Sequence, residues 1–322
     1  MKNIILWIML LTINVFGQLL ENKFYDEHII NGGAEKIGEF NFVEYSVKSE
    51  NGKVLYQIID KVDYDVPYSK LEVFGNGNSV LISAFYGTLT FINNDGTKGK
   101  SVKIKDSLKV EYERTIQSVV YNKRLLVLFQ ELNAKVSTIQ KYDADGTLKM
   151  EFEIPITDIN GIAFSELTNQ IFVSHFNWKD SGELEKRVTL LNSNGEILKS
   201  VNATFEKGFF TNDSQFIGYS NKSVFAFNTK SKTLQFVENL NDNQVLLDVS
   251  YLKKEIIVAI SNIPKLKAGK WYYKNPTVLK VNSVGDVLTE TNFTTDLFDS
   301  YKLKRNENSI KFIAGEKSFE VE

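Results

Sequence analysis

The sequence predicts an all-β fold, a single β-propeller, because one type of turn recurs along the chain between β-like runs. The turn glycines that follow Asn or Asp are Gly52, Gly96, Gly146 and Gly195, at intervals of 44, 50 and 49 residues. The next turn of this kind contains Gly285, 90 residues later, and polar residues 228–232 fill the place of a turn between them. A period of this size that carries several short strands is typical of propeller blades.

Each repeat contains two apolar runs before the turn and a more polar run after it. In one repeat the three runs are 79–85, 88–92 and 101–104, and Asp95-Gly96 separates the last two. Near-continuous apolar runs suit strands covered on both faces, whereas alternating runs suit strands with one solvent-exposed face. Asn-Gly and Asp-Gly accept positive φ, so these turns should join the third and fourth strands of each blade.

Runs that fit the innermost strand of a blade occur six times, at 70–74, 116–121, 160–165, 207–210, 245–251 and 297–303. Six periods of about 47 residues account for residues 41–322, which we expect to form one domain after a lead-in segment, 18–40. The hairpin at 42–59 and the runs at 310–314 and 318–321 predict a blade shared by both ends of the chain. Such closure removes a free sheet edge. A seventh, irregular blade built from 24–39 is the alternative.

The segments around three turns carry a family resemblance. Residues 142–148 read Tyr-Asp-Ala-Asp-Gly-Thr-Leu, and residues 191–198 and 281–288 repeat the same arrangement. They resemble blades of the six-bladed propellers of the TolB-like and NHL-like kind, and the resemblance covers nearly the whole chain after the N-terminus. Propellers of this kind include lyases, lactonases, dehydrogenases and binding modules, so the resemblance implies a fold and leaves the activity open.

The N-terminus predicts a signal peptide, residues 1–17. Lys2 supplies a short positive region, residues 4–15 are apolar, and Gly17 precedes the expected cut before Gln18. This stretch is shorter than the ~20 apolar residues of a membrane span, although an uncleaved anchor is the alternative. We expect an exported protein, periplasmic or secreted, with no transmembrane segment in the mature chain.

Composition excludes several kinds of partner and site. The net charge of −2 and pI near 5.9 give no long-range attraction to nucleic acid or to an anionic membrane. The absence of cysteine excludes disulfides, thiolate catalysis and Cys-based metal sites. With only His28 and His175, a zinc site with several histidines is also excluded. No EF-hand, phosphate loop or nucleophile elbow occurs.

Two long inserts, at 175–183 and 263–276, interrupt the connection between the second and third strands of two repeats. The same connection is short at Tyr86-Gly87. Equivalent connections emerge on one face of a propeller, together with the acidic loops that lead into the innermost strands. The predicted ligand-binding face therefore contains Tyr86, His175, Trp178, Trp271, Tyr272, Tyr273, Asp63, Asp65, Asp158, Asp242 and Asp296. Trp and Tyr supply much of the binding energy at protein interfaces, but these rings could instead cover their own blades.

Three functions fit these observations. The first is an exported, monomeric binding module that recognises a protein or a carbohydrate on the insert-bearing face and needs no cofactor. The second is a hydrolase or lyase that uses a calcium ion held by oxygen ligands, because Ca²⁺ needs only carboxylates, carbonyls and waters. The third is a structural component of an envelope complex. The lack of a histidine cluster favours the first over the second.

Overall fold

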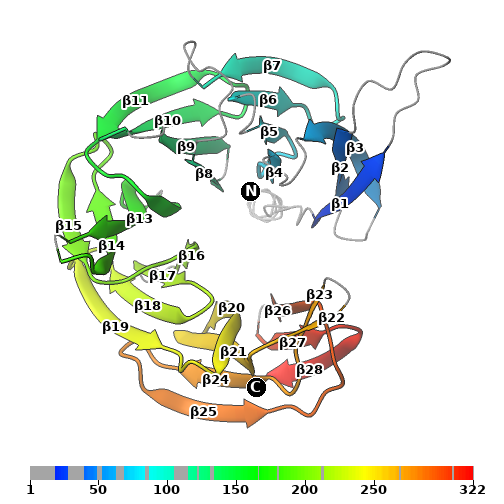
Figure 1. Cartoon of the computed structure of the whole chain (residues 1–322), viewed down its shortest axis with the longest axis vertical. Coiled ribbons are helices and arrows are strands. Elements are labelled where there is room, and N and C mark those ends of the chain that lie inside the picture. Colours follow the sequence, from blue (N-terminus) through cyan, green and yellow to red (C-terminus); the bar gives the residue numbers. More distant parts are fainter. Residues whose placement is uncertain are drawn as a thin grey trace, which may run out of the picture. The chain divides into compact units, whose positions relative to one another are not determined.

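The structure is a computed structural model of the 322-residue chain. It describes residues 19–27, 40–48, 53–62, 69–83, 87–104, 115–121, 123–130, 134–165, 167–179, 181–211, 214–267, 270–306 and 308–321. These residues form an all-β fold of the propeller class, and the chain divides into two compact units, 1–155 and 156–322 (Figure 1). Within the described ranges no helix is long and apolar enough to cross a membrane.

Unit 1 contains three antiparallel sheets, each with its strands paired in chain order. Sheet 1 consists of β1 (Leu19–Glu27), β2 (Phe40–Lys48) and β3 (Val54–Val62). Sheet 2 consists of β4 (Ser69–Val73), β5 (Ser79–Ser83), β6 (Thr88–Ile92) and β7 (Lys98–Lys103). Sheet 3 consists of β8 (Thr115–Tyr121), β9 (Arg124–Gln130), β10 (Ser137–Asp143) and β11 (Leu148–Ile154).

Unit 2 contains four more sheets and a short ribbon. Sheet 4 consists of β12 (Ile159–Ser165), β13 (Gln170–Trp178), β14 (Leu184–Leu191) and β15 (Ile197–Val201). Sheet 5 consists of β16 (Lys207–Phe210), β17 (Gln215–Tyr219), β18 (Ser223–Asn228) and β19 (Thr233–Asn239). Sheet 6 consists of β20 (Gln244–Leu252), β21 (Glu255–Asn262), β24 (Thr277–Val281) and β25 (Val287–Asn292). Sheet 7 consists of β26 (Tyr301–Arg305), β27 (Ile310–Ala314) and β28 (Lys317–Val321). The separate ribbon consists of β22 (Lys265–Lys267) and β23 (Lys270–Tyr272).

The six runs predicted as innermost strands all overlap a strand that begins a sheet: β4, β8, β12, β16, β20 and β26. The predicted N-terminal hairpin is larger than expected, because β1 pairs with β2 along its whole length. Since β3 occupies the other edge of β2, the lead-in segment contributes a strand. The described residues thus form five four-stranded and two three-stranded sheets besides the ribbon. The predicted blade shared by both chain ends stays a prediction.

The recurrent turns have the predicted form. Gly96, Gly146, Gly195 and Gly285 have φ between 82° and 99° and lie between the third and fourth strands of their sheets. In the first of these turns the amide of Asn93 donates to the carbonyl of Thr97 at 2.9 Å, and the amide of Gly96 donates back to Asn93 at 2.9 Å. Each of these recurrent turns therefore belongs to a different sheet, so the spacing of the turn glycines in the sequence follows the succession of the sheets.

The sheets of unit 2 pack against each other face to face. Phe172 and Leu190 of sheet 4 lie in one buried cluster with Phe216 and Phe225 of sheet 5. A second cluster joins sheets 5 and 6, and a third joins sheets 6 and 7. The first strands β16, β20 and β26 lie on one side of unit 2, and the fourth strands β15, β19 and β25 lie on the other (Figure 1). This stacking holds the strand connections at fixed positions along the sheet edges.

Candidate functional site

Both predicted inserts occupy the same place in their sheets. The insert at 175–183 joins β13 to β14, and the insert at 263–276 joins β21 to β24, so each connects the second strand of a sheet to the third. The two inserts differ in form. The first lengthens the two strands that it joins, whereas the second forms the separate ribbon β22–β23 (Figure 1).

The first insert ends in a hairpin tip that presents a tryptophan to solvent. Trp178 pairs in register with Leu184 across the tip, and its side chain is 64% exposed. Gly182, with φ of 80°, closes the turn, in which its amide donates to the carbonyl of Lys179 at 2.8 Å. An ion pair of 2.8 Å joins Lys179 and Glu183 across the same tip. The sequence therefore places an apolar pair on a hydrogen-bonded hairpin.

The second insert presents a similar apolar pair on the ribbon. Leu266 and Trp271 are cross-strand partners, 58% and 53% exposed, and Ile263 before the ribbon is also exposed. The remaining ribbon residues include three exposed lysines, 265, 267 and 270. Exposed apolar side chains grouped in this way are typical of interaction sites. We call Trp178, Leu184, Ile263, Leu266 and Trp271 the insert surface.

Hydrogen bonds show that both inserts leave the sheets at the edge where the first strands begin. In sheet 4 the amide of Phe176 donates to the carbonyl of Asp158, which precedes β12, at 3.0 Å. In sheet 6 the amide of Ile263 donates to the carbonyl of Asn243, which precedes β20, at 3.0 Å.

The same edge continues from one sheet of unit 2 to the next. Ser174 of β13 accepts a hydrogen bond from the amide of Phe205, just before β16, at 3.0 Å. The carbonyl of Asn221, after β17, accepts one from the amide of Leu246 in β20 at 2.9 Å. The two inserts therefore share one face of unit 2, as the sequence predicted.

Tyr273 anchors the second insert to sheet 7. Its amide and carbonyl both bond to Phe298, just before β26, at 2.8 and 3.1 Å. Its ring stacks on Phe298 and meets the ring of Tyr301 edge-on, with centroid distances of 5.9 and 5.0 Å. Tyr272 is half-buried beside it. Tyr273 therefore packs onto the sheets, while Trp271 faces solvent.

His175 is buried beneath the first insert. Its Nε2 lies 2.9 Å from Oγ1 of Thr189, which in turn lies 2.8 Å from Oγ of Ser200. Burial lowers the pKa of the imidazole, because the charged form loses hydration. A neutral, hydrogen-bonded histidine within a sheet supports the insert and is not itself an exposed contact residue.

Three of the acidic residues predicted for this face, Asp158, Asp242 and Asp296, lie in separate loops with separate partners. Asp158 and Asp242 are exposed, and their carbonyls accept hydrogen bonds from Phe176 and from the Lys222 ammonium. Asp296 forms a 2.8 Å ion pair with Lys317, which lowers the pKa of its carboxyl. Among the described residues no three His, Cys, Asp or Glu side chains are grouped so that they could hold a metal ion.

Three residues predicted for the face, Asp63, Asp65 and Tyr86, lie outside the described residues. Sequence reasoning also missed Leu184, Ile263 and Leu266. The signal for Leu266 was present, because it alternates with Lys265 and Lys267 as a side chain on one face of a strand does.

A half-buried aspartate on β20 also went unpredicted. Asp248 sits at a β-bulge, and its carboxylate accepts hydrogen bonds from the amides of Leu303 and Val249 at 2.8 and 2.9 Å. Burial raises the pKa of this carboxyl despite these bonds. Burial, with a smaller effect of Asp248, raises the pKa of Tyr219 to about 12. The carboxylate links the first strands of sheets 6 and 7, and both its oxygens are engaged.

Comparison with known proteins identifies the fold. The propeller of Dos1 matches with a TM-score of 0.57 at 8% identity, over 87% of this chain and 73% of that one. The C-terminal WD40 domain of Sif2 matches with a TM-score of 0.53 at 12% identity, over 88% and 76%. Hydrazine synthase of Kuenenia stuttgartiensis gives 0.51 at 14% identity, over 78% and 75%. No family model and no curated protein sequence matches the chain. At such identities the likeness is one of fold alone.

Proposed function

We propose that this protein is an exported β-propeller binding module that recognises a protein or carbohydrate ligand through the insert surface. One observation carries the proposal. Two inserts at the same step of two sheets emerge on one face of unit 2, and each presents an exposed tryptophan paired with leucine. An exposed Trp loses little rotamer entropy on binding and contributes a large contact area, so such rings are frequent at binding sites.

The charges around the insert surface favour a ligand that carries carboxylate or other anionic groups. The ribbon bears three exposed lysines, and among the described residues only Lys270 of these three has a carboxylate nearby, that of Asp299 at 3.7 Å. Lysines at the rim of an apolar contact steer oppositely charged ligands and add modest affinity. Acidic protein surfaces and acidic polysaccharides both have this chemistry.

The proposal is tested with Trp178→Ala and Trp271→Ala. The wild-type protein and both variants are immobilised and exposed to extracellular proteins from the source culture and to a panel of neutral and acidic glycans. We expect one ligand to lose more than tenfold in affinity in both variants, since a hot-spot residue contributes above ~1.4 kcal/mol. Added calcium should leave the melting temperature unchanged, whereas a rise would favour the calcium-dependent enzyme.

Leu167→Ala is the matched control. Leu167 is also exposed and apolar, at 70%, but it lies between β12 and β13, at the opposite edge of sheet 4. A ligand that all three variants lose equally is bound non-specifically. A ligand that the two tryptophan variants retain contradicts the proposed site.

The proposed export and the propeller type rest on the sequence. If residues 1–17 are a signal peptide, the mature protein should begin at Gln18, which N-terminal mass spectrometry of the exported material checks.

Seven sheets in the described residues favour the seven-blade alternative over six blades, because the two three-stranded sheets together hold more strands than one shared blade.

A further inference from the structure

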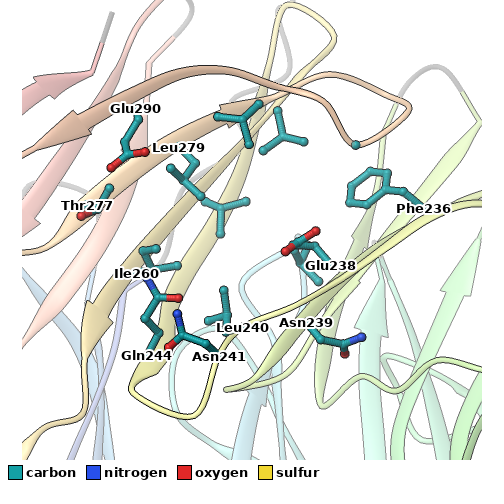
Figure 2. A pocket seen from close by; sticks show the side chains of 15 residues that line it. Phe236, Glu238, Asn239, Leu240, Asn241, Gln244, Ile260, Thr277, Leu279 and Glu290 are labelled. Atoms are coloured by element: carbon teal, nitrogen blue, oxygen red, sulfur yellow. The ribbon is translucent and has the colours of Figure 1, made fainter.

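Sheets 5 and 6 of unit 2 enclose a cavity of about 380 Å³ that is separate from the insert surface (Figure 2). Its wall on sheet 5 includes Val224, Phe236 and Glu238, and its wall on sheet 6 includes Val258, Leu279 and Glu290. This volume falls within the range of about 300 to 1,000 Å³ that is usual for small-molecule sites. The cavity is therefore large enough for a small organic ligand.

Strand register gives each wall the same composition, one carboxylate beside an apolar cross-strand neighbour. Glu238 of β19 lies opposite Val224 of β18, and Glu290 of β25 lies opposite Leu279 of β24. Figure 2 shows Glu238 and Glu290 on opposite sides of the cavity. The floor is apolar, since Val224 and Val258 are almost completely buried.

No cation of the described chain neutralises these two carboxylates. Neither Glu238 nor Glu290 forms an ion pair within the described ranges, where Glu290 accepts one hydrogen bond of 3.3 Å, from the side-chain Nδ2 of Asn292. The ammonium of Lys222 instead donates to the carbonyls of Asn241, Asp242 and Gln244. Two solvent-exposed carboxylates therefore flank an apolar floor and have no ion-pair partner in the part of the chain that the structure describes.

We propose that this cavity binds a small organic cation, an amine with an apolar body. The apolar body would pack on Val224, Val258 and Leu279, and the ammonium group would lie near Glu238 and Glu290. Burying the apolar body supplies most of the affinity, and the carboxylates select the sign of the charge. Anionic ligands are disfavoured, because they would bring like charge to both walls.

Three test compounds of similar size separate charge from shape: 2-phenylethylammonium, 2-phenylethanol and phenylacetate. Binding to the full chain is followed by ligand-observed NMR. We expect the ammonium compound to bind about tenfold more tightly than the alcohol, and phenylacetate not to bind. Two partly exposed ion pairs give an effect of this size. In the double variant Glu238→Gln and Glu290→Gln, the preference for the ammonium compound should be lost while binding of the alcohol is retained.

Two controls locate the effect. Glu206→Gln removes an exposed carboxylate before β16, outside the cavity lining, and should leave the preference unchanged. Trp271→Ala removes the proposed ligand contact of the insert surface and should also leave it unchanged. Equal binding of all three compounds, no binding of any, or an unchanged preference in the double variant would each overturn the proposal, whatever the result at the insert surface.

Discussion

Gly146 lies directly against the ring of Phe91, so a Cβ at this position would stand 2.7 Å from Cδ2 of that ring. Two other turn glycines have the same relationship to the preceding sheet. A Cβ at Gly96 would stand 2.7 Å from Cβ of Tyr56, and a Cβ at Gly285 would stand 2.9 Å from Cβ of Phe236. The recurrent glycine therefore has two causes: a positive φ and an aromatic ring of the neighbouring sheet in the place of a side chain.

Replacing Gly146 with alanine should destabilise unit 1 by about 2–4 kcal/mol. The positive φ of 82° costs about 1 kcal/mol for a residue with a Cβ, and the new methyl group must displace Phe91, an overpacking cost of about 1–3 kcal/mol. Urea unfolding followed by tryptophan and tyrosine fluorescence measures the loss.

Gly182→Ala is the control, because it isolates the backbone contribution. Gly182 has nearly the same φ, 80°, but no atom lies within 4 Å of the position that a Cβ would take. Its replacement should cost only about 1 kcal/mol. Equal losses at the two glycines would show that the ring contact contributes nothing.

The parts of the fold that depend on local interactions could be predicted from the sequence, and the parts that depend on distant contacts could not. The turns at Gly96 and Gly146 were predictable, because Asp-Gly determines a hairpin within a few residues. The strand β1 was not, because residues 19–27 lack a clear alternation and acquire their structure by pairing with β2. The ring contact of the turn glycines also joins residues about 40 to 55 positions apart, as Gly146 and Phe91 are, so no local pattern reveals it.

The candidate site was only partly predictable for the same reason. The position of the two inserts followed from the repeat, and both Trp178 and Trp271 are exposed. Their aromatic neighbours could not be sorted from the sequence. Tyr273 is held against Phe298, and His175 is held by Thr189, through contacts that depend on neighbouring strands.

Tyr273→Ala should destabilise unit 2, whereas Trp271→Ala should not. The ring of Tyr273 packs against the cluster that joins sheets 6 and 7, so its loss should cost about 2–4 kcal/mol. Trp271 is 53% exposed, and its replacement should cost less than about 1 kcal/mol. Urea denaturation of both variants checks this, and a large loss in Trp271→Ala would mean that the ribbon is part of the core.

The half-buried carboxyl of Asp248 should make unit 2 less stable as pH rises. Burial raises its pKa in the folded protein above the ordinary value of 3.8. At a pH between the ordinary pKa and the raised pKa of the folded protein, the folded state binds more protons than the unfolded state. The free energy of unfolding therefore falls with increasing pH. We expect the stability of the wild type relative to Asp248→Asn to decrease as pH rises from the ordinary value through the raised one.

Asp248→Asn also loses one hydrogen-bond acceptor. The stability lost in this way is the same at every pH, so it does not affect the pH dependence of the difference between the two proteins. Asp242→Asn serves as the control, since Asp242 is exposed in the loop before β20. Urea midpoints measured between pH 4 and pH 7 give the two differences. A constant difference for Asp248→Asn across this range would contradict a raised pKa.

Lys222 should stabilise the loop that leads into β20. Its ammonium donates to the carbonyls of Gln244, Asp242 and Asn241 at 2.6, 3.0 and 3.4 Å, three acceptors that a single donor group brings together. Lys222→Met keeps the aliphatic stem but removes the three donors, so we expect a loss of about 1–2 kcal/mol. The amide of Leu246 bonds to the carbonyl of Asn221, so the hydrogen-exchange protection of the Leu246 amide should also fall in Lys222→Met.

Lys230→Met is the control. Lys230 lies in the exposed turn before β19, and its replacement should change neither the stability nor the protection of Leu246. If Lys222→Met had the same stability and the same hydrogen-exchange protection as Lys230→Met, the three hydrogen bonds would not hold the loop.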